Sequence, residues 1–339
     1  MIAFYKKYKK AIRVILLLLV LAFVGQFIKH TNFEEIGEYL KQIPFTFLGI
    51  LGLSFLAYLS ATIAWRLCLG ADSAKANIGQ LFMMRHVGEM LSVFNPTSVI
   101  AGETLKAHYL KRQGVSSENS ISSLLISRIL IILSAILLML LSSIYLIVNI
   151  YGADKNLVFV ILAAITIGGF GYLLARFLLH SKLYLAHFIK RLQDRFGEKY
   201  ITTKLCLQIE NINRTCYTFY KYNKTKFNSA FMLSIIHWML GAAEFYLILQ
   251  ALGFECTLLN ALAIEMGVIL FKTIGAVVPG QVGVEEYANK VMLGMIGIAS
   301  NEVWVVVSIM RRARQIFWVG VAGIFYWLIG RMKTVQVIE

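Results

Sequence analysis

Proline and charged residues are both scarce in this chain of 339 residues. It has only three prolines, and Asp, Glu, Lys and Arg make up 15% of it, whereas a soluble domain carries about 25% charged residues. Hydrophobic residues reach 58%, and the mean hydropathy is +0.71. Several apolar stretches exceed the roughly 20 residues that a spanning helix needs. The composition therefore predicts an all-α polytopic membrane protein that forms a single integral membrane domain over residues 1–339.

The chain also lacks the usual signatures of catalytic and metal sites. Its four cysteines form no CxxC pair, its six histidines show no metal-ligand spacing, and no glycine-rich phosphate loop, GxSxG or HExxH sequence is present. We therefore expect no metal, no cofactor and no catalytic residue. An accessory membrane subunit and a membrane enzyme acting on lipid-linked substrates stay open as alternatives to a transporter.

Negative charge is also in short supply, because 33 Lys and Arg residues face 18 Asp and Glu, a net charge of +15. The basic residues lie in segments beside apolar spans, which is typical of a cytoplasmic membrane face and not of nucleic-acid binding. Five of them precede the first apolar run, and residues 182–226 hold ten basic and three acidic residues. Both termini are therefore expected in the cytoplasm, and the acidic loop 29–44 outside.

The apolar pattern predicts about six full spans and two re-entrant hairpins. The hairpins, residues 78–100 and 258–278, are apolar but end in helix-breaking sequences, which is tolerable at membrane depth only where protein or a wet cavity covers the backbone. Residues 182–226 repeat apolar side chains at helical spacing and predict a basic amphipathic connector. It could contact anionic lipid or simply join the two halves. The predicted spans are residues 11–28, 45–69, 121–148, 157–178, 230–252 and 303–329.

An internal repeat relates the two halves of the chain without a gap. Residues 96–128 share eight identities with the stretch that begins at Pro279. Paired helix breaks in two halves of a membrane chain point to a transport site at the repeat interface. We predict inverted repeats over residues 45–150 and 228–330; two unrelated proline kinks are the alternative. The identical pairs are Pro96/Pro279, Val99/Val282, Glu103/Glu286, Leu110/Leu293, Gly114/Gly297, Ser117/Ser300, Ile126/Ile309 and Arg128/Arg311.

Charged residues at bilayer depth are the candidate site, because such residues persist only where they are paired or line a wet path. One interpretation is a central polar cavity in which arginine binds a lipid phosphate and glutamate binds the rest of the headgroup. The other is that Glu–Arg pairs only lock the helices together. The candidate substrate-binding residues are Glu103, Arg128, Glu285, Glu286, Arg311 and Arg312, and the candidate helix-break residues are Pro96, Gly102, Pro279, Gly280 and Gly283.

Two further polar pairs have seven-residue spacing, which brings their members to one helix face. They are His237 with Glu244 and Glu265 with Lys272. A proton relay and polar packing between helices both fit this spacing.

The residues around the breaks resemble two signatures of a known family. Asn95-Pro96 through Gly102-Glu103, with Arg128, resembles the first, and residues 278–286 resemble the second. The family is the flippase-like transmembrane family named for the membrane region of lysylphosphatidylglycerol synthase, and the similarity covers about residues 10–330. Two residues depart from the family pattern, because Ala101 and Gln281 stand at positions where the family often has glycine.

The resemblance implies a protein of the inner (cytoplasmic) membrane of a bacterium that moves polar lipids between leaflets. Its partners would be membrane lipids, anionic or glycosylated, and enzymes of envelope-lipid synthesis. Relatives fused to a soluble aminoacyl-transferase domain also make the lipid. Because this sequence ends nine residues after Gly330, we expect a stand-alone translocase.

Overall fold

The structure is a computed structural model that describes residues 33–42, 45–94, 98–149, 183–198, 202–276, 278 and 281–330, with isolated residues between 161 and 176. Within these ranges, α-helices and one 3₁₀ turn are the only regular elements. The helices are α2 (Phe33–Gln42), α3 (Thr46–Cys68), the 3₁₀ turn η1 (Gly70–Ala74), α4 (Ile78–Phe94), α5 (Ser98–Arg112), α6 (Ser117–Asn149), α8 (Tyr184–Phe196), α9 (Thr203–Tyr222), α10 (Lys224–Ala251), α11 (Leu258–Ile274), α12 (Val284–Met295) and α13 (Asn301–Gly330).

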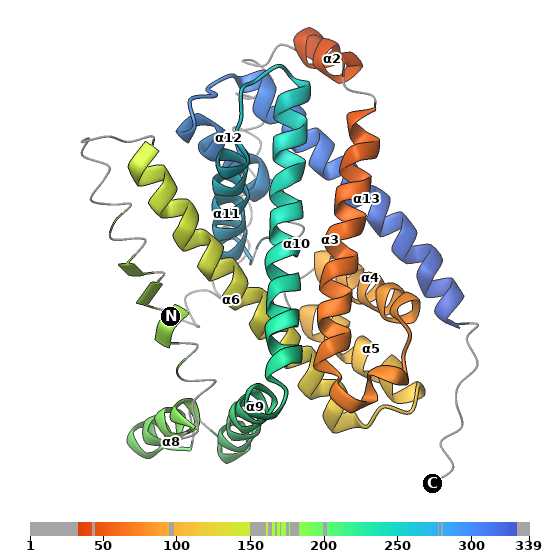
Figure 1. The fold of residues 1–339 in the computed structure, drawn as a ribbon, viewed down its shortest axis with the longest axis vertical. Helices are drawn as coiled ribbons and strands as arrows, with labels where there is room; N and C mark the ends of the chain where they lie inside the picture. Colours follow the sequence, from red (N-terminus) through yellow and green to blue (C-terminus); the bar gives the residue numbers. More distant parts are fainter. Residues whose placement is uncertain are drawn as a thin grey trace, which may run out of the picture.

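The centre of the fold is the antiparallel pair α3 and α10 (Figure 1). The buried face of α3 carries mostly small side chains at helical spacing, among them Ser54, Ala57, Ala61 and Ala64. Without strong hydrophobic attraction between helices in lipid, such small residues permit close van der Waals packing. Gly49 is part of this contact, since a Cβ atom there would lie 2.7 Å from Leu247 on α10.

Two helical hairpins occupy opposite ends of this pair. In Figure 1, α4 and α5 lie towards the end where α3 finishes, and α11 and α12 lie towards the end where α10 finishes. Each hairpin leads into a long oblique helix, α6 or α13, through a glycine with positive φ, Gly114 at +79° and Gly297 at +90°. These two glycines are matched in the sequence repeat. Each long helix packs against the hairpin of the other half, α13 on α4 and α6 on α11.

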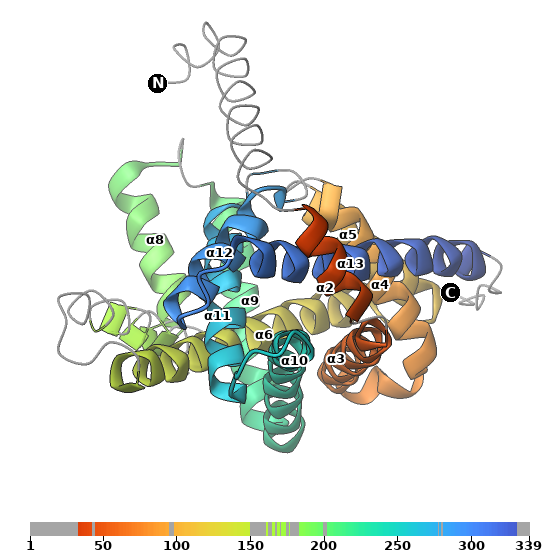
Figure 2. The ribbon, with the colours of Figure 1, turned by 90° about the horizontal axis from the view of Figure 1, so that it is seen from above.

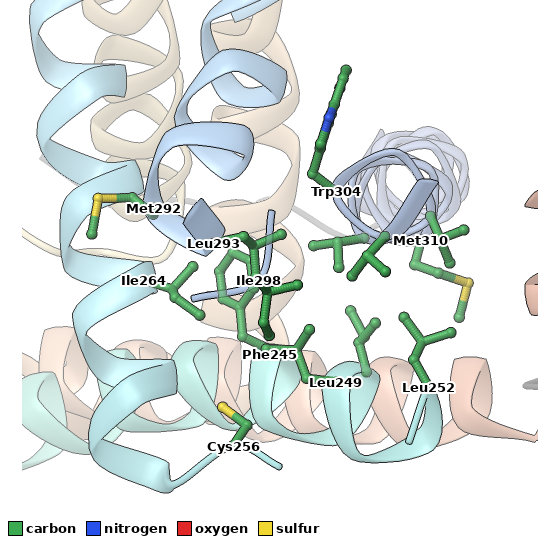
Figure 3. Packing of buried hydrophobic residues seen from close by; sticks show 14 of the residues in the cluster. Phe245, Leu249, Leu252, Cys256, Ile264, Met292, Leu293, Ile298, Trp304 and Met310 are labelled. Carbon is green, nitrogen blue, oxygen red and sulfur yellow. The ribbon is translucent and has the colours of Figure 1, made fainter. Parts of the chain in front are cut away.

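Seen from above, α3 and α10 are viewed along their axes while α6 and α13 run across the molecule (Figure 2). The largest apolar cluster lies where α10, α11, α12 and α13 meet (Figure 3). Phe245 is fully buried at its centre, with Ile264, Leu293 and Met310 in the same cluster. This packing fixes the four helices that carry one of the charged clusters described below.

Three described helices, α3, α6 and α10, are long and apolar enough to cross a membrane. They match three of the six predicted spans. The fourth long helix, α13, has 30 residues but carries three arginines. Predicted span 11–28 lies outside the described residues and 157–178 does so for the most part, so the count of six is not tested.

Two local predictions are corrected by the structure. The segment 29–44 is not simply a loop, because it contains α2, whose Ile36 is buried in the core cluster beside α13. Gly102 does not break a helix, because α5 continues through it. Its carbonyl oxygen lies 3.0 Å from the position that a Cβ atom on Gly88 of α4 would take.

Of the other helix-break residues, the structure describes only Gly283. Pro96, Pro279 and Gly280 lie outside the described residues, but α4 ends at Phe94 before α5 begins, and α11 ends at Ile274 before α12 begins. Gly283 precedes α12 with φ of +82°, a conformation that glycine adopts without steric cost. Gln281 also has positive φ, +52°, at the position where the resembled family commonly has glycine.

Candidate functional site

Four charged side chains from three helices form the first cluster, defined as Glu89, Glu103, Lys106 and Arg128. Arg128 Nη2 lies 2.6 Å from Glu103 Oε1 and 2.9 Å from Glu89 Oε1. Lys106 Nζ lies 2.9 Å from Glu103 Oε1 and 3.0 Å from Glu89 Oε1. Two cations therefore bridge the same two carboxylates, so each charge keeps a partner when one contact opens.

Close packing of α4 on α5 places Lys106 in this cluster. A Cβ atom on Gly88 would lie 2.4 Å from Lys106 Cε, so glycine at this position leaves room for the lysine stem. Glu103 and Lys106 are three residues apart on α5, which brings them to one face of the helix. Arg128 reaches the same point from α6.

The first cluster borders a cleft that is partly open. The side chains of Arg128 and Glu89 are both 37% exposed, whereas that of Lys106 is 5% exposed. The enclosed part measures only about 20 Å³, enough for about one water molecule. Its further lining comes from Ala61, Trp65, Leu124, Ser127 and Ile131, with one more cation, Arg85.

Glu103 is not fully satisfied inside this cleft. Its Oε1 atom accepts hydrogen bonds from Lys106 and Arg128. Its Oε2 atom is buried and has no hydrogen-bond partner among the described residues. A buried carboxylate oxygen without a donor costs free energy, so the cleft offers an acceptor to any ligand that brings an N–H or O–H group.

The second cluster is centred on Arg311, whose guanidinium group faces three carboxylates. It lies 3.0 Å from Glu265, 3.3 Å from Glu285 and 3.6 Å from Glu244, the shortest N–O distance in each case. The Arg311 side chain is 3% exposed, and those of the three glutamates are 1–5% exposed. The guanidinium carbon also lies 4.2 Å from the centre of the Phe245 ring, which adds a cation–π contact.

The remaining charges of the second cluster surround this centre. Arg314 contacts Glu244, and Lys272 Nζ lies 3.1 Å from Glu285 Oε2. Arg312 Nε donates to Glu286 Oε1 at 2.7 Å. Four carboxylates thus face four cations, and the set is neutral: Glu244, Glu265, Glu285 and Glu286 against Lys272, Arg311, Arg312 and Arg314.

The start of α12 explains the position of two of these carboxylates. Glu285 and Glu286 occupy its first turn, where the helix dipole favours negative charge. Glu286 Oε2 also accepts a hydrogen bond from the backbone N–H of Gly283 at 2.7 Å. Gln281, in its left-handed conformation, accepts a hydrogen bond from Arg312 through its carbonyl oxygen at 3.0 Å.

The predicted site residues therefore fall into two clusters that share no ion pair among the described residues. Glu103 and Arg128 contact each other, in agreement with the interpretation that glutamate and arginine form pairs. Their repeat partners do not, because Glu286 pairs with Arg312 and Arg311 pairs with Glu285. In the sequence repeat, the residue that corresponds to Glu285 is Gly102, which has no carboxylate. A single central cavity lined by all four matched charges is thus not what the structure shows, and the substrate-binding role of the buried members stays a prediction.

Sequence reasoning missed several members of both clusters. Glu89 lies within the predicted hairpin 78–100 and Lys106 lies three residues after Glu103, a spacing that was a usable signal. Glu244, Glu265 and Lys272 were noticed for spacing on their own helices, yet each pairs with a residue from another helix. His237 contacts the backbone oxygen of Ala57 and not Glu244. Only the helix packing reveals these partners.

In the part of the chain that the structure describes, no group of three His, Cys, Asp or Glu side chains could hold a metal ion. Both clusters offer charge-assisted hydrogen bonds, which arginine and lysine donate and carboxylates accept. Both clusters lie on helices whose neighbours are apolar, where charges need partners.

Comparison with known proteins agrees with this membrane setting. Residues 10–323 match the family described as the lysylphosphatidylglycerol synthase TM region. Neither the curated proteins nor the solved structures gave a match. The family match covers nearly the whole chain and confirms the resemblance seen at the two helix breaks. This chain, a helical membrane protein, belongs to the family of the lysylphosphatidylglycerol synthase transmembrane region.

Proposed function

We propose that this protein moves a polar or charged lipid headgroup between the leaflets of the membrane. The observation that carries the proposal is the first cluster, in which half-exposed Arg128 and Glu89 border a partly open cleft between α3, α4, α5 and α6. Charged groups that only stabilise helix packing gain nothing from exposure to a cleft. A headgroup that enters the cleft can exchange contacts with these groups while its acyl chains stay in the bilayer.

The doubled ion pairs of the first cluster suit such an exchange. Lys106 contacts both carboxylates from its buried position. When Arg128 turns towards a ligand, both glutamates therefore keep a cation. The enclosed space of about 20 Å³ is too small for a headgroup, so entry requires the exposed side chains of Arg128 and Glu89 to move aside. The planar fork of arginine can then bind two oxygens of a phosphate group.

The arrangement proposed for this activity is a pair of inverted repeats with two re-entrant hairpins. It is supported by the matched order of α4–α5–α6 and α11–α12–α13 and by their location at opposite ends of the α3/α10 pair (Figure 1). The basic segments favour cytoplasmic termini in a bacterial inner membrane. Cysteines at exposed Glu118 and Glu255, introduced into a cysteine-free chain, should then react with an impermeant reagent from the inside and the outside respectively.

Translocation is tested by reconstitution of the full chain into liposomes with fluorescent lipids that carry different headgroups. Wild-type protein should expose at least one lipid of the panel to an external quencher faster than protein-free liposomes do. Arg128→Ala should abolish the gain, whereas Arg214→Gln, which changes an exposed pair on α9, should keep it. If no lipid of a panel with anionic, zwitterionic and glycosylated headgroups moves faster than in empty liposomes, the proposal fails.

A further inference from the structure

We infer that Arg85 is the residue that selects a phosphate-bearing headgroup in the cleft of the first cluster. This inference rests on the proposed function, because it names the lipid chemistry that the cleft recognises. It starts from a difference in charge. Arg85, Lys106 and Arg128 line the cleft together with only two carboxylates, Glu89 and Glu103, whereas the second cluster is neutral.

Arg85 is the one of these three cations that makes no ion pair within 4.0 Å in the described part of the chain. Arg128 and Lys106 each contact both glutamates, but Arg85 makes no ion pair with any described residue. It lies on α4, one helical turn before Glu89, and its side chain is half-buried. Glu89 and Glu103 attract Arg85 electrostatically, but these two carboxylates are shared by three cations. A positive charge in excess at a partly dehydrated site is unfavourable, so the cleft favours a ligand that supplies negative charge.

Aromatic contacts hold Arg85 in place for such a ligand. Its guanidinium carbon lies 5.3 Å from the centre of the Tyr58 ring on α3. The ring of Tyr58 is itself fixed by edge contacts with His86 and Trp318, at 5.0 and 5.3 Å between ring centres. Stacking on a ring face leaves the N–H groups at the edge of the guanidinium plane free to donate.

The two unsatisfied groups of the cleft complement one headgroup. Arg85 offers donors for a phosphodiester oxygen, and Glu103 Oε2 offers an acceptor for a hydroxyl or ammonium group on the same headgroup. The repeat position of Arg85 in the second half is Val268, which is fully buried. Phosphate selection is therefore a property of the first half alone.

The test measures binding by the purified full chain in detergent, by calorimetric titration with three probes. They are short-chain phosphatidylglycerol, a neutral glucosyl diacylglycerol with the same acyl chains, and inorganic phosphate. Wild-type protein should bind phosphatidylglycerol at least about tenfold more tightly than the neutral lipid, and Arg85→Gln should weaken phosphatidylglycerol binding about 10- to 150-fold. Its effect on the neutral lipid should stay within about twofold.

Two variants control the interpretation. Arg85→Lys keeps the charge but loses the planar fork and should fall between wild type and Arg85→Gln; it carries the test if Arg85→Gln does not fold. Arg214→Gln removes a distant arginine and should bind all three probes as wild type does. If inorganic phosphate binds as tightly as the lipid and depends equally on Arg85, the site takes a free anion and the lipid assignment is overturned.

Failure of this inference is distinguishable from failure of the proposed function. If folded Arg85→Gln and Arg85→Lys proteins bind phosphatidylglycerol as wild type does, Arg85 does not select phosphate, although translocation can still be observed. If phosphatidylglycerol binding depends on Arg85 but no lipid is translocated in liposomes, the binding site stands and the transport proposal fails.

Discussion

The two charged clusters occupy related places in the two halves of the chain but differ in exposure and in charge. In the first cluster Arg128 and Glu89 are 37% exposed and border a cleft. In the second, Arg311 and its three carboxylates are at most 5% exposed, and the whole cluster of four carboxylates and four cations is neutral. The same residue types thus serve two purposes: charges that a ligand can reach, and charges that hold helices together.

The difference follows from what encloses each cluster. The second cluster is held by α10, α11, α12 and α13, whose apolar side chains form the largest core of the molecule (Figure 3). The first is held by α4, α5 and α6, and α3 covers it with small residues and Trp65. Burial makes each charge more dependent on its partner, so equal substitutions should have unequal effects.

Arg311→Ala should produce the largest loss of stability. It leaves three buried glutamates around a missing cation, and breaking a buried ion pair costs about 3–5 kcal/mol. Folded yield and thermal unfolding in detergent measure the effect. Arg311→Lys, which restores one positive charge, should recover part of it. An alanine variant as stable as wild type would mean that water reaches this cluster and that the contrast with the first cluster is wrong.

Gly88→Ala should destabilise the α4–α5 contact by about 1–3 kcal/mol. The added methyl group would meet Lys106 Cε at 2.4 Å and the backbone oxygen of Gly102 at 3.0 Å. Lys106 would have to leave the two carboxylates. Gly52→Ala on α3 is the matched control, because nothing lies within 4 Å of its Cβ position. The control should be neutral or slightly stabilising; similar losses in both variants would contradict the packing argument.

Arg128→Ala should lower stability by only about 1 kcal/mol. Its side chain is 37% exposed, and Lys106 still lies 2.9–3.0 Å from both carboxylates after its removal. The same variant should nevertheless lose lipid translocation. Unfolding and transport are measured on one preparation. A drop in stability as large as that of Arg311→Ala would show that the first cluster is also a structural lock.

Glu286→Gln should have the smallest effect of the series, about 0.3–1 kcal/mol. The carboxylate is 26% exposed and pairs with Arg312, and it accepts a hydrogen bond from the N–H of Gly283. Glutamine keeps an oxygen for that hydrogen bond but loses the charge at the start of α12. Thermal unfolding resolves the difference, and a loss above 2 kcal/mol would place Glu286 with the fully buried charges.

Much of the helical pattern could be predicted from the sequence, because apolar runs and glycine positions are local signals. Predicted spans 45–69, 121–148 and 230–252 match α3, α6 and α10 within a few residues. The matched glycines 114 and 297 both adopt positive φ. The connector 182–226 contains two helices, α8 and α9, in the segment where apolar side chains recur at helical spacing.

The partners of the charged residues could not be predicted in the same way. Sequence alignment of the two halves pairs Arg311 with Arg128 and Glu286 with Glu103, but ion pairs depend on which helix face meets which neighbour. A shift of one residue along α12 turns the side chain by about 100°, so Glu285 faces Arg311 and Glu286 faces Arg312. The exposed fraction of each charged side chain also depends on which helices cover it, and no local sequence pattern predicts this covering.

Paired measurement of Arg128→Lys and Arg311→Lys tests the central claim most directly. Both variants keep the charge and lose the planar fork, and each is assayed for melting temperature and for lipid transport per folded molecule. The account predicts that Arg128→Lys melts near wild type but transports at least about tenfold more slowly, whereas Arg311→Lys melts lower and its folded fraction transports near the wild-type rate. Transport that is lost only in folded Arg311→Lys would contradict it and would move the headgroup site to the second cluster.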